Sequence, residues 1–265
     1  MSSRVSEDYV RAKPPDGTFR PEFYSFGKGG YWSGGVSDPT IGKLDFMDVA
    51  RTIAGPLRSR NYLPATDPKA TRLLIMVYWG TTQGPGPQNQ SVQFEAAKTA
   101  NDVLQQLIAS AAPPAVIAAA REDYAAAIGS LQTLDTARKQ RDVQNCKILG
   151  FDSWWSSTTR FEGLPMQFLR QDMLDELEED RYFVVLMAYD FQLMWKEKKP
   201  KLLWETRFSI RRRRHEFDRD LLRMAAEAAQ YFGRESHSLI RERLPETNVI
   251  LGQPKVIEYE PEKTK

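Results

Sequence analysis

Two apolar stretches of the chain decide its fold: Tyr182-Phe-Val-Val-Leu-Met-Ala-Tyr-Asp-Phe-Gln-Leu-Met-Trp195 and Leu202-Leu-Trp-Glu-Thr-Arg-Phe-Ser-Ile-Arg211. In the second stretch apolar and polar residues alternate, which is the pattern of a strand with one buried face. The first stretch is apolar at every second position from Phe183 onward, and its other positions turn polar at Asp190. We therefore predict that the two stretches pair as an antiparallel hairpin in the protein core.

The register of this hairpin follows from the requirement that both apolar faces lie on the same side of the sheet, because a slip of one residue would reverse one of them. A four-residue turn at 197–200 satisfies this requirement. It also places Asp190 opposite Arg207, an opposite-charge pair that contributes about 0.2–1 kcal/mol. The expected partners are Trp195 with Leu202, Leu193 with Trp204, Tyr189 with Phe208, and Met187 with Ile210.

The composition is that of an ordinary globular protein. Of the 265 residues, 41% are hydrophobic and 27% are charged, which argues against wholesale disorder. The 37 Lys and Arg residues nearly balance the 35 Asp and Glu residues, so we expect no nucleic-acid partner. A single cysteine, Cys146, excludes an intrachain disulfide, and with only His215 and His237 a Cys/His metal site is not expected. We predict no cofactor.

The first 43 residues lack periodicity and are rich in Pro, Gly and Ser, so we predict an extended, irregular N-terminal arm over residues 1–43. Within it, Phe26-Gly-Lys-Gly-Gly-Tyr-Trp-Ser-Gly-Gly35 invites comparison with a phosphate-binding loop. It lacks the GxxxxGK[ST] spacing, however, and it follows no predicted strand. We interpret it as a glycine-rich turn whose Tyr31 and Trp32 pack onto the domain.

The sequence leaves the cellular location open. No apolar run reaches the roughly 18 residues of a membrane-spanning helix, so we expect no transmembrane segment. The first residues, Met1-Ser-Ser-Arg-Val-Ser-Glu-Asp8, have no apolar signal-peptide core. The protein is then either cytoplasmic, or a protein of the bacterial periplasm or cell envelope whose signal peptide was removed and replaced by an added Met1.

Helix and strand signals alternate over residues 44–260. Asp45 and Asp48 mark a helix start, Leu73–Trp79 is apolar on both faces like a central strand, and an amphipathic helix from Phe217 ends at Gly233. A final strand is expected within 255–259, before a charged tail at 261–265. We predict one α+β domain over 44–260, a mainly antiparallel sheet covered by helices with an inserted antiparallel helical hairpin.

The inserted hairpin corresponds to residues 91–146, which are rich in Ala, Gln and charged residues. Pro113-Pro114 interrupts the helical pattern, so we predict two antiparallel helices. Two interpretations stay open: the hairpin packs on the sheet, or it projects as an arm that binds a protein partner or a second copy. A heptad pattern runs along the second helix at Ile117, Tyr124, Leu131 and Arg138, with Ala120, Ala127 and Leu134 between them.

Two adjacent tryptophans, Trp154 and Trp155, lie in a segment without periodicity. Exposed tryptophan rings stack on sugars and bases, so Trp32, Trp154 and Trp155 are candidate ligand-binding residues. The alternative is that one ring of the adjacent pair belongs to the core and a loop covers the other.

A run of basic residues follows the second hairpin strand. Guanidinium groups bind phosphates and carboxylates, so this run is a candidate anion site. Glu216, Asp218 and Asp220 follow at once, which favours an exposed corner neutralised by its own carboxylates. The candidate anion-binding residues are Arg211, Arg212, Arg213 and Arg214, with His215 beside them.

No catalytic motif indicates an enzyme. Glu235-Ser-His-Ser238 contains an acid, a serine and a histidine, but the members of a triad normally come from different elements. A G-x-S-x-G nucleophile elbow is absent from the sequence. The acidic residues between Asp172 and Asp180 are interpreted as a solvated helix face. We predict neither catalytic nor metal-binding residues.

Four short segments carry a resemblance to a known family. They are Leu57-Arg-Ser-Arg-Asn-Tyr62, Leu73-Leu-Ile-Met-Val-Tyr-Trp79, Ala188-Tyr-Asp-Phe191 and Leu202-Leu-Trp-Glu205. Together they resemble a family of bacterial cell-envelope lipoproteins of unknown function, over about a third of the chain. The chain departs from the family pattern because it has no lipid-attachment cysteine near its N-terminus and because it carries the insertion at 91–146. The resemblance implies an envelope location and a non-catalytic module, and it implies no site residues.

The leading expectation is therefore a non-catalytic envelope or extracytoplasmic interaction protein that contacts another protein through residues 91–146 or through an aromatic loop. One alternative is a binding module for a glycan or another small molecule that uses the tryptophan loop. A second alternative is a hydrolase whose site has no recognisable motif.

Overall fold

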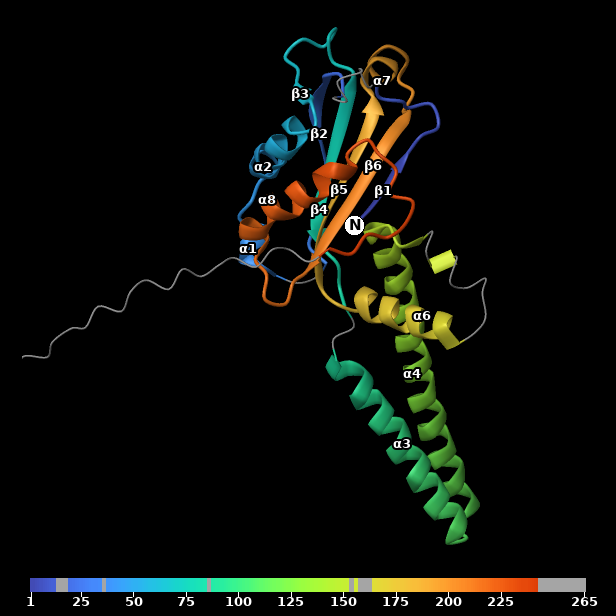
Figure 1. Ribbon diagram of the computed structural model, residues 1–265. Helices are drawn as coiled ribbons and strands as arrows, with labels where there is room; N and C mark the ends of the chain where they lie inside the picture. The colour runs from blue at the N-terminus through green and yellow to red at the C-terminus, as the bar shows by residue number, and fades with distance from the viewer. Residues whose placement is uncertain (13–18, 35–36, 85–86, 153–154, 157–163, 243–265) are drawn as a thin grey trace, which may run out of the picture.

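The computed structural model describes residues 1–12, 19–34, 37–84, 87–152, 155–156 and 164–242 (Figure 1). The strands are β1 (Ser2–Val5), β2 (Glu22–Trp32), β3 (Tyr62–Pro64), β4 (Leu73–Thr81), β5 (Arg181–Asp190) and β6 (Leu202–Arg211). The helices are α1 (Pro39–Gly42), α2 (Phe46–Arg58), α3 (Pro87–Ala109), α4 (Pro114–Leu149), α6 (Leu164–Leu177), α7 (Phe191–Glu197) and α8 (Phe217–Ala228), followed by the 3-10 turn η1 (Ala229–Tyr231). The predicted α+β class is confirmed.

The six strands form one mixed sheet in the order β1-β6-β5-β4-β2-β3, so the prediction of a mainly antiparallel sheet is only partly right. β5 pairs antiparallel with β4 and β6, and β6 pairs antiparallel with β1. In contrast, β2 runs parallel to both β3 and β4. The parallel pairing arises because α1 and α2 form a crossover that returns the chain to the end of the sheet where β2 begins.

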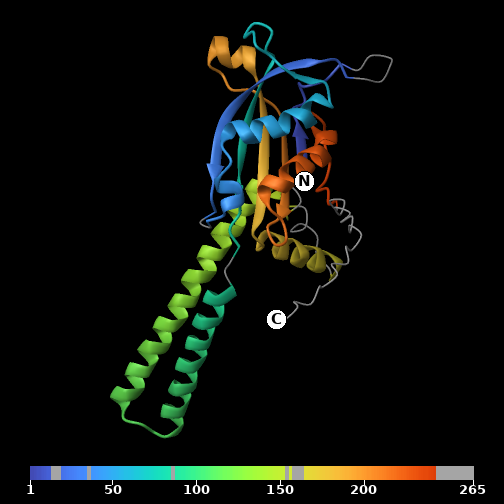
Figure 2. The same cartoon turned by 90° about the vertical axis from the view of Figure 1, so that its left-hand side faces the viewer.

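One face of the sheet, which we call the main face, is covered by α2 and α8 (Figures 1 and 2). The predicted start of α2 is confirmed: Asp45 accepts a hydrogen bond from the Asp48 N–H at 2.9 Å, and Asp48 accepts one from the Asp45 N–H at 3.1 Å. The helix predicted from Phe217 to Gly233 is present, but it ends at Ala228 and continues as the 3-10 turn η1. Its inner side is buried, as an amphipathic helix requires: Phe217, Leu221, Met224, Ala225 and Ala228, together with Phe232 beyond it.

The predicted strand pair is present, but its length and register differ from the prediction. β5 ends at Asp190, whose carboxylate accepts a hydrogen bond from the Leu193 N–H at 2.9 Å and so caps the short helix α7. Asp190 lies opposite Leu73 of β4, and Arg207 lies opposite Val185. The predicted Asp190–Arg207 pair is therefore wrong. The predicted partners are wrong too, because Tyr189 faces Leu202, Ala188 faces Trp204, Val184 faces Phe208 and Tyr182 faces Ile210.

The error in register has a physical cause: β5 is buried on both faces. Tyr182, Val184, Leu186 and Ala188 join the core of the main face, whereas Phe183 and Val185 belong to a second cluster on the opposite face. A strand that is apolar on both sides carries no alternation to reveal which side faces which layer.

The N-terminal region is not an irregular arm throughout, because residues 2–5 and 22–32 are strands of the sheet. The glycine-rich segment belongs to β2 and is not a turn. Side chains of β4 lie directly across it and would have to move to admit a larger residue: a Cβ at Gly27 would be 2.3 Å from Met76 Sδ, and one at Gly29 would be 2.7 Å from the Tyr78 ring. The ring of Tyr31 lies 5.9 Å from that of Trp79, as part of the packing onto the domain that we predicted.

Between β4 and β5 the chain makes a long excursion through α3, α4 and α6. The last turns of α4 and the helix α6 cover the second face of the sheet, around a cluster that contains Cys146, Leu149, Met173 and Leu177. We call the helical pair α3 and α4 the arm (residues 87–149); its base, the last turns of α4, packs on the sheet, and the remainder extends away from it (Figure 2). Most of the insertion projects, whereas the last turns of α4 pack on the sheet, so each interpretation describes part of it (Figure 2). That the projecting part binds a partner or a second copy stays a prediction.

The heptad pattern correctly predicts the side of α4 that faces its neighbours. Ala120 is buried, and Ile117, Tyr124, Ala127, Leu131, Leu134 and Arg138 are half-buried. On α3, Ala97 and Leu104 are the buried residues of the same contact. The predicted strand at 255–259 and the tail at 261–265 lie outside the described residues.

Candidate functional site

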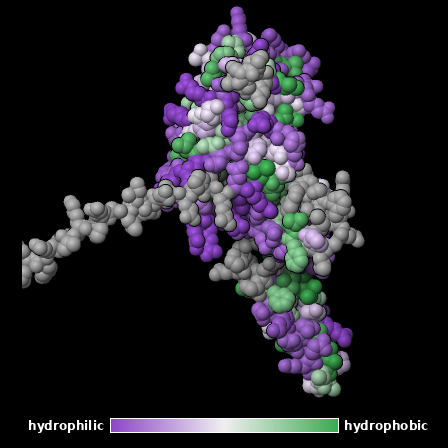
Figure 3. Space-filling view, viewed as in Figure 1, coloured by the Kyte–Doolittle hydropathy of each residue, from purple (hydrophilic) through white to green (hydrophobic). Residues whose placement is uncertain are grey.

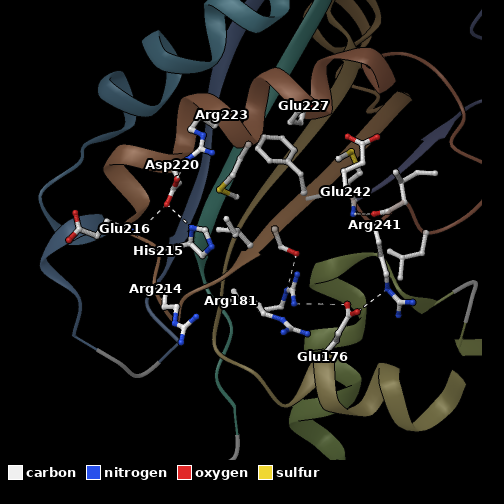
Figure 4. A pocket seen from close by; sticks show the side chains of 18 of the residues that line it. Glu176, Arg181, Arg214, His215, Glu216, Asp220, Arg223, Glu227, Arg241 and Glu242 are labelled. Atoms are coloured by element: carbon white, nitrogen blue, oxygen red, sulfur yellow. Dashed lines mark hydrogen bonds and ion pairs between the residues drawn. The ribbon is translucent and has the colours of Figure 1, made fainter. Parts of the chain in front are cut away.

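The arginine-rich corner after β6 opens into a cleft of about 1440 Å³ (Figure 4). The end of β6 and the first turns of α8 line one side of this cleft, and the start of β5, the end of α6 and residues 239–242 line the other. Arg211 and Arg214 line the cleft, whereas Arg212 and Arg213 line only a smaller neighbouring hollow. The four candidate anion-binding arginines therefore do not all face the same space.

Two of these four arginines are neutralised by carboxylates. Arg211 Nε lies 2.6 Å from Glu179 Oε2, and Arg212 Nε lies 3.0 Å from Asp38 Oδ2. The side chains of the other two are exposed and form neither a hydrogen bond nor an ion pair with the described residues. Anion binding at this corner stays a prediction. Of the four candidate residues, only Arg213 and Arg214 have no carboxylate partner among the described residues.

Sequence analysis missed the most buried arginine of the cleft, Arg181. Its side chain is 11% exposed, its Nη1 lies 4.0 Å from Glu176 and 3.8 Å from Glu179, and its Nε donates to Ser209 Oγ at 3.2 Å. Burial lowers the pKa of Arg181, and the two carboxylates oppose that effect. Nothing in the sequence marks this residue, because it is simply the first position of an apolar strand.

His215 is held on the opposite side of the cleft. Its Nδ1 lies 2.9 Å from Asp220 Oδ2, and Asp220 also accepts a hydrogen bond from Arg223 Nη1 at 3.2 Å. Figure 4 shows this group across the cleft from Arg181 and Glu176. The cleft therefore holds two separate groups of ion pairs: His215, Asp220 and Arg223 at the start of α8, and Arg181 with Glu176 and Glu179 at the start of β5. In both groups the cations face carboxylates, which leaves less positive charge for an anion.

The candidate tryptophans occupy different environments. Trp32 is the last residue of β2 and is half exposed. Trp155 packs against the second cluster of the sheet, of which Trp32 is not a member. Trp154 lies outside the described residues. A shared tryptophan platform for a glycan stays a prediction, and packing accounts for Trp155.

The serine and histidine near residue 236 do not contact each other in the described structure. Ser236 Oγ donates to the backbone oxygen of Ser238 at 2.8 Å, and the Ser3 N–H donates to Ser236 Oγ at 3.0 Å. Ser236 therefore covers the outer edge of β1 and is occupied there. Over the part of the chain that the structure describes, no group of three or more His, Cys, Asp or Glu side chains is placed to hold a metal ion.

The base of the arm is fixed to the sheet by polar groups. Arg207 on β6 donates through Nη1 to the backbone oxygens of Lys147 at 2.7 Å and Ile148 at 3.2 Å. These carbonyls belong to the last turn of α4, where the i+4 helical partners are missing and a cation is favoured by the helix dipole, and the Gly150 N–H also donates to the Lys147 oxygen at 3.3 Å. Asn145, which is 3% exposed, donates to the oxygens of Gln83 and Leu177 at 3.0 Å each.

A tight passage of β1 past the end of α4 completes this attachment. Gly150 ends the helix with φ +74°, and a Cβ there would lie 2.1 Å from Ser2 Oγ and 2.8 Å from Arg207 Cδ. The arm is thus held at its base by a helix end that is both capped and closely packed.

The free end of the arm carries no charged side chain on either helix. No Asp, Glu, Lys or Arg lies between Asp102 on α3 and Arg121 on α4, in a chain that is 27% charged. Within this segment Val103, Ile108 and Val116 are exposed, at 46%, 43% and 45% of their surfaces. Figure 3 shows hydrophobic residues at the end of the arm farthest from the sheet. Sequence analysis missed this segment, although the gap in charge is visible in the sequence.

No protein-family model, curated protein or solved structure matches this chain. Among the described helices, none is both long enough and apolar enough to cross a membrane. The contacts and surfaces described above therefore carry the functional argument.

Proposed function

We propose that this protein is a non-catalytic interaction protein of the bacterial cell envelope, and that it makes its contact through the free end of the arm. The single observation that carries the proposal is the charge-free end, with Ile108 and Val116 exposed on it. Exposed apolar surface that is gathered at one place, rather than scattered, marks interaction sites.

The way in which the arm is built supports this role. Its two helices bury their facing side chains against each other, so the exposed apolar residues are not needed to hold the helices together. Its base is fixed to the sheet by Arg207 and Asn145. The body therefore holds the free end at a defined distance, which suits a contact element better than it suits a covering layer.

The envelope location rests on the resemblance to envelope lipoproteins, and the non-catalytic character rests on the pairing of the polar groups. Ser236 is hydrogen-bonded to backbone, and His215 is engaged with Asp220, which also binds Arg223. A site for glycans has less support, because Trp155 is engaged in packing.

The test is fractionation of cells of the source organism that express the full chain with either of two double substitutions. Ile108→Glu with Val116→Glu places two charges at the free end, and Val143→Glu with Phe168→Glu places the same charge on exposed apolar residues elsewhere. We expect wild type and the second variant to appear in the envelope fraction or in an assembly larger than the monomer. We expect at least about tenfold less of the first variant there, because each buried charge costs more than 1 kcal/mol.

The proposal fails if wild type is found as a free monomer outside the envelope. It also fails if both double variants fractionate like wild type. Circular dichroism of the purified variants would confirm that the arm helices are retained in each case.

A further inference from the structure

The free end of the arm offers evidence about what it contacts. The apolar surface at this end is not confined to one side: Ile108 and Ala109 are exposed in succession on α3, and Ala115 and Val116 are exposed in succession on α4. Successive residues of a helix point about 100° apart, so the apolar surface extends around the end of the arm. A groove on a partner protein contacts one side of a helix, whereas a lipid layer surrounds whatever enters it.

The turn between the helices is suited to an environment without water. Pro113 and Pro114 carry no N–H group. Around them, the N–H groups of Ser110, Ala111 and Ala112 donate to backbone oxygens of α3 at 3.0–3.1 Å, and those of Val116 and Ile117 donate to the Pro113 oxygen at 2.9 and 3.2 Å. Backbone donors that are already satisfied remove much of the cost of placing a turn in hydrocarbon.

The charged residues nearest the turn set a depth. On α3, Asp102 lies about 10 Å from the C-terminal end of the helix, at a rise of about 1.5 Å per residue. On α4, Arg121 lies about 10 Å from Pro114. These two distances agree, and they match the upper end of the roughly 5–10 Å to which interfacial helices enter a bilayer. Ser110, the polar residue nearest the turn, donates its hydroxyl to the Leu107 oxygen at 3.1 Å.

The charges above this level indicate the kind of lipid. Asp102, Glu122 and Asp123 outnumber Arg121 around the arm at the height where lipid headgroups would lie. Carboxylates are repelled by anionic headgroups, so this arrangement favours a neutral surface.

We propose that the end of the arm, from Leu107 to Ile117, inserts into one leaflet of a zwitterionic lipid membrane and holds the α+β body away from the surface. This inference rests on the proposed function, since it names the surface that the arm contacts. Insertion of a helical turn to this depth is consistent with the lack of a membrane-spanning helix among the described residues.

The experiment uses the purified full chain and flotation with vesicles of phosphatidylcholine alone or of phosphatidylcholine mixed with phosphatidylglycerol. We expect wild type to float with the neutral vesicles and to bind the mixed vesicles no better. The Ile108→Glu, Val116→Glu variant should bind at least about tenfold more weakly, because charged side chains are expelled from hydrocarbon. The control variant Val143→Glu, Phe168→Glu should bind like wild type.

The inference is overturned if wild type does not float with neutral vesicles, or if the two double variants float equally. Sedimentation velocity without vesicles separates this failure from that of the proposed function. If the wild type forms dimers that the first variant loses, the arm contacts a second copy and only the lipid inference falls. If neither vesicles nor self-association respond to the first variant while cell fractionation does, the contact is with another protein, and again only the lipid inference falls.

Discussion

The two faces of the sheet are covered in different ways. The main face is closed by α2 and α8 over a large set of buried apolar side chains, including Trp204 and Phe208. The second face is closed by the last turns of α4 and by α6 over a smaller cluster, and Arg207 and Asn145 add hydrogen bonds to backbone at its edge. The difference indicates that the main face provides most of the folding free energy, whereas the second face orients an attached element.

The contacts on the two faces also differ in how strictly they fix the position and direction of the covering helices. Apolar burial is non-directional, so α2 and α8 need only the right pattern of side chains. A guanidinium group bound to two carbonyls at the end of a helix fixes both position and direction. That is the interaction required where a long arm must point in one direction.

The largest effect is expected on the main face. Trp204→Ala removes a ring that is 1% exposed, and it should lower the free energy of unfolding by about 3–5 kcal/mol. Trp195→Ala, which truncates a ring that is 44% exposed, should change that free energy by less than about 1 kcal/mol. Unfolding in urea, followed by far-ultraviolet circular dichroism, measures both. Equal losses in the two variants would contradict the assignment of the main core.

A smaller and local effect is expected on the second face. Arg207→Lys keeps the charge but loses the planar group that reaches two carbonyls, at a cost of about 1–3 kcal/mol. Hydrogen exchange should accelerate in the last turns of α4 and remain unchanged in α2. The control is Arg4→Lys, at a more exposed ion pair with Asp152. If exchange in α2 rises together with exchange in α4, the two faces are not separable as described.

The smallest effect depends on pH and concerns the main face. Burial alone would raise the pKa of Asp38, but hydrogen bonds from Tyr182 and Thr40 outweigh it and hold the pKa below its usual range. A carboxylate with a lowered pKa in the folded state stabilises the fold above its unfolded pKa of about 3.9. That stability is lost as the pH falls through the folded pKa.

We therefore expect Asp38→Asn to cost about 1 kcal/mol at pH 7 and to bind fewer protons on unfolding in acid. Its free energy of unfolding should change less than that of wild type between pH 5 and pH 3, whereas Trp195→Ala, which removes no titratable group, should keep the wild-type pH profile. Urea unfolding at each pH measures this. Parallel profiles for wild type and Asp38→Asn would show that Asp38 is not coupled to folding.

Much of the architecture could be predicted from the sequence, and the failures share one physical origin. The faces of β6 and α8 were correct because each element is buried on one side, so that polar and apolar residues separate. The pairing of β5 and the existence of β2 were missed because both depend on the second layer. Phe183 and Val185 are apolar because they pack against that layer, and Gly27 and Gly29 leave room for the side chains of Met76 and Tyr78 on β4.

The candidate site was predictable in part for a similar reason. The heptad pattern identifies the side on which the helices of the arm meet, but a pattern of contacts along a pair says nothing about where the pair points. The direction depends on two sets of contacts that the sequence does not reveal. Arg207, which is far from the arm in the sequence, binds backbone oxygens at the end of α4. Asn145, on α4 itself, binds the backbone oxygens of Gln83 and Leu177. The absence of charged residues between Asp102 and Arg121 indicates a contact surface only when that segment is known to lie at a free end.

The excursion between β4 and β5 begins and ends at neighbouring points. Thr81 lies opposite Tyr182, and the Thr82 N–H donates to the Arg181 oxygen at 2.8 Å. Without the excursion, these two strands would be joined by an ordinary tight turn. The entropy of closing a loop grows only slowly with its length, so the length of the insertion costs the sheet little. Any other module grafted at this junction would, however, have to supply its own apolar cover for Phe183 and Val185 on the second face.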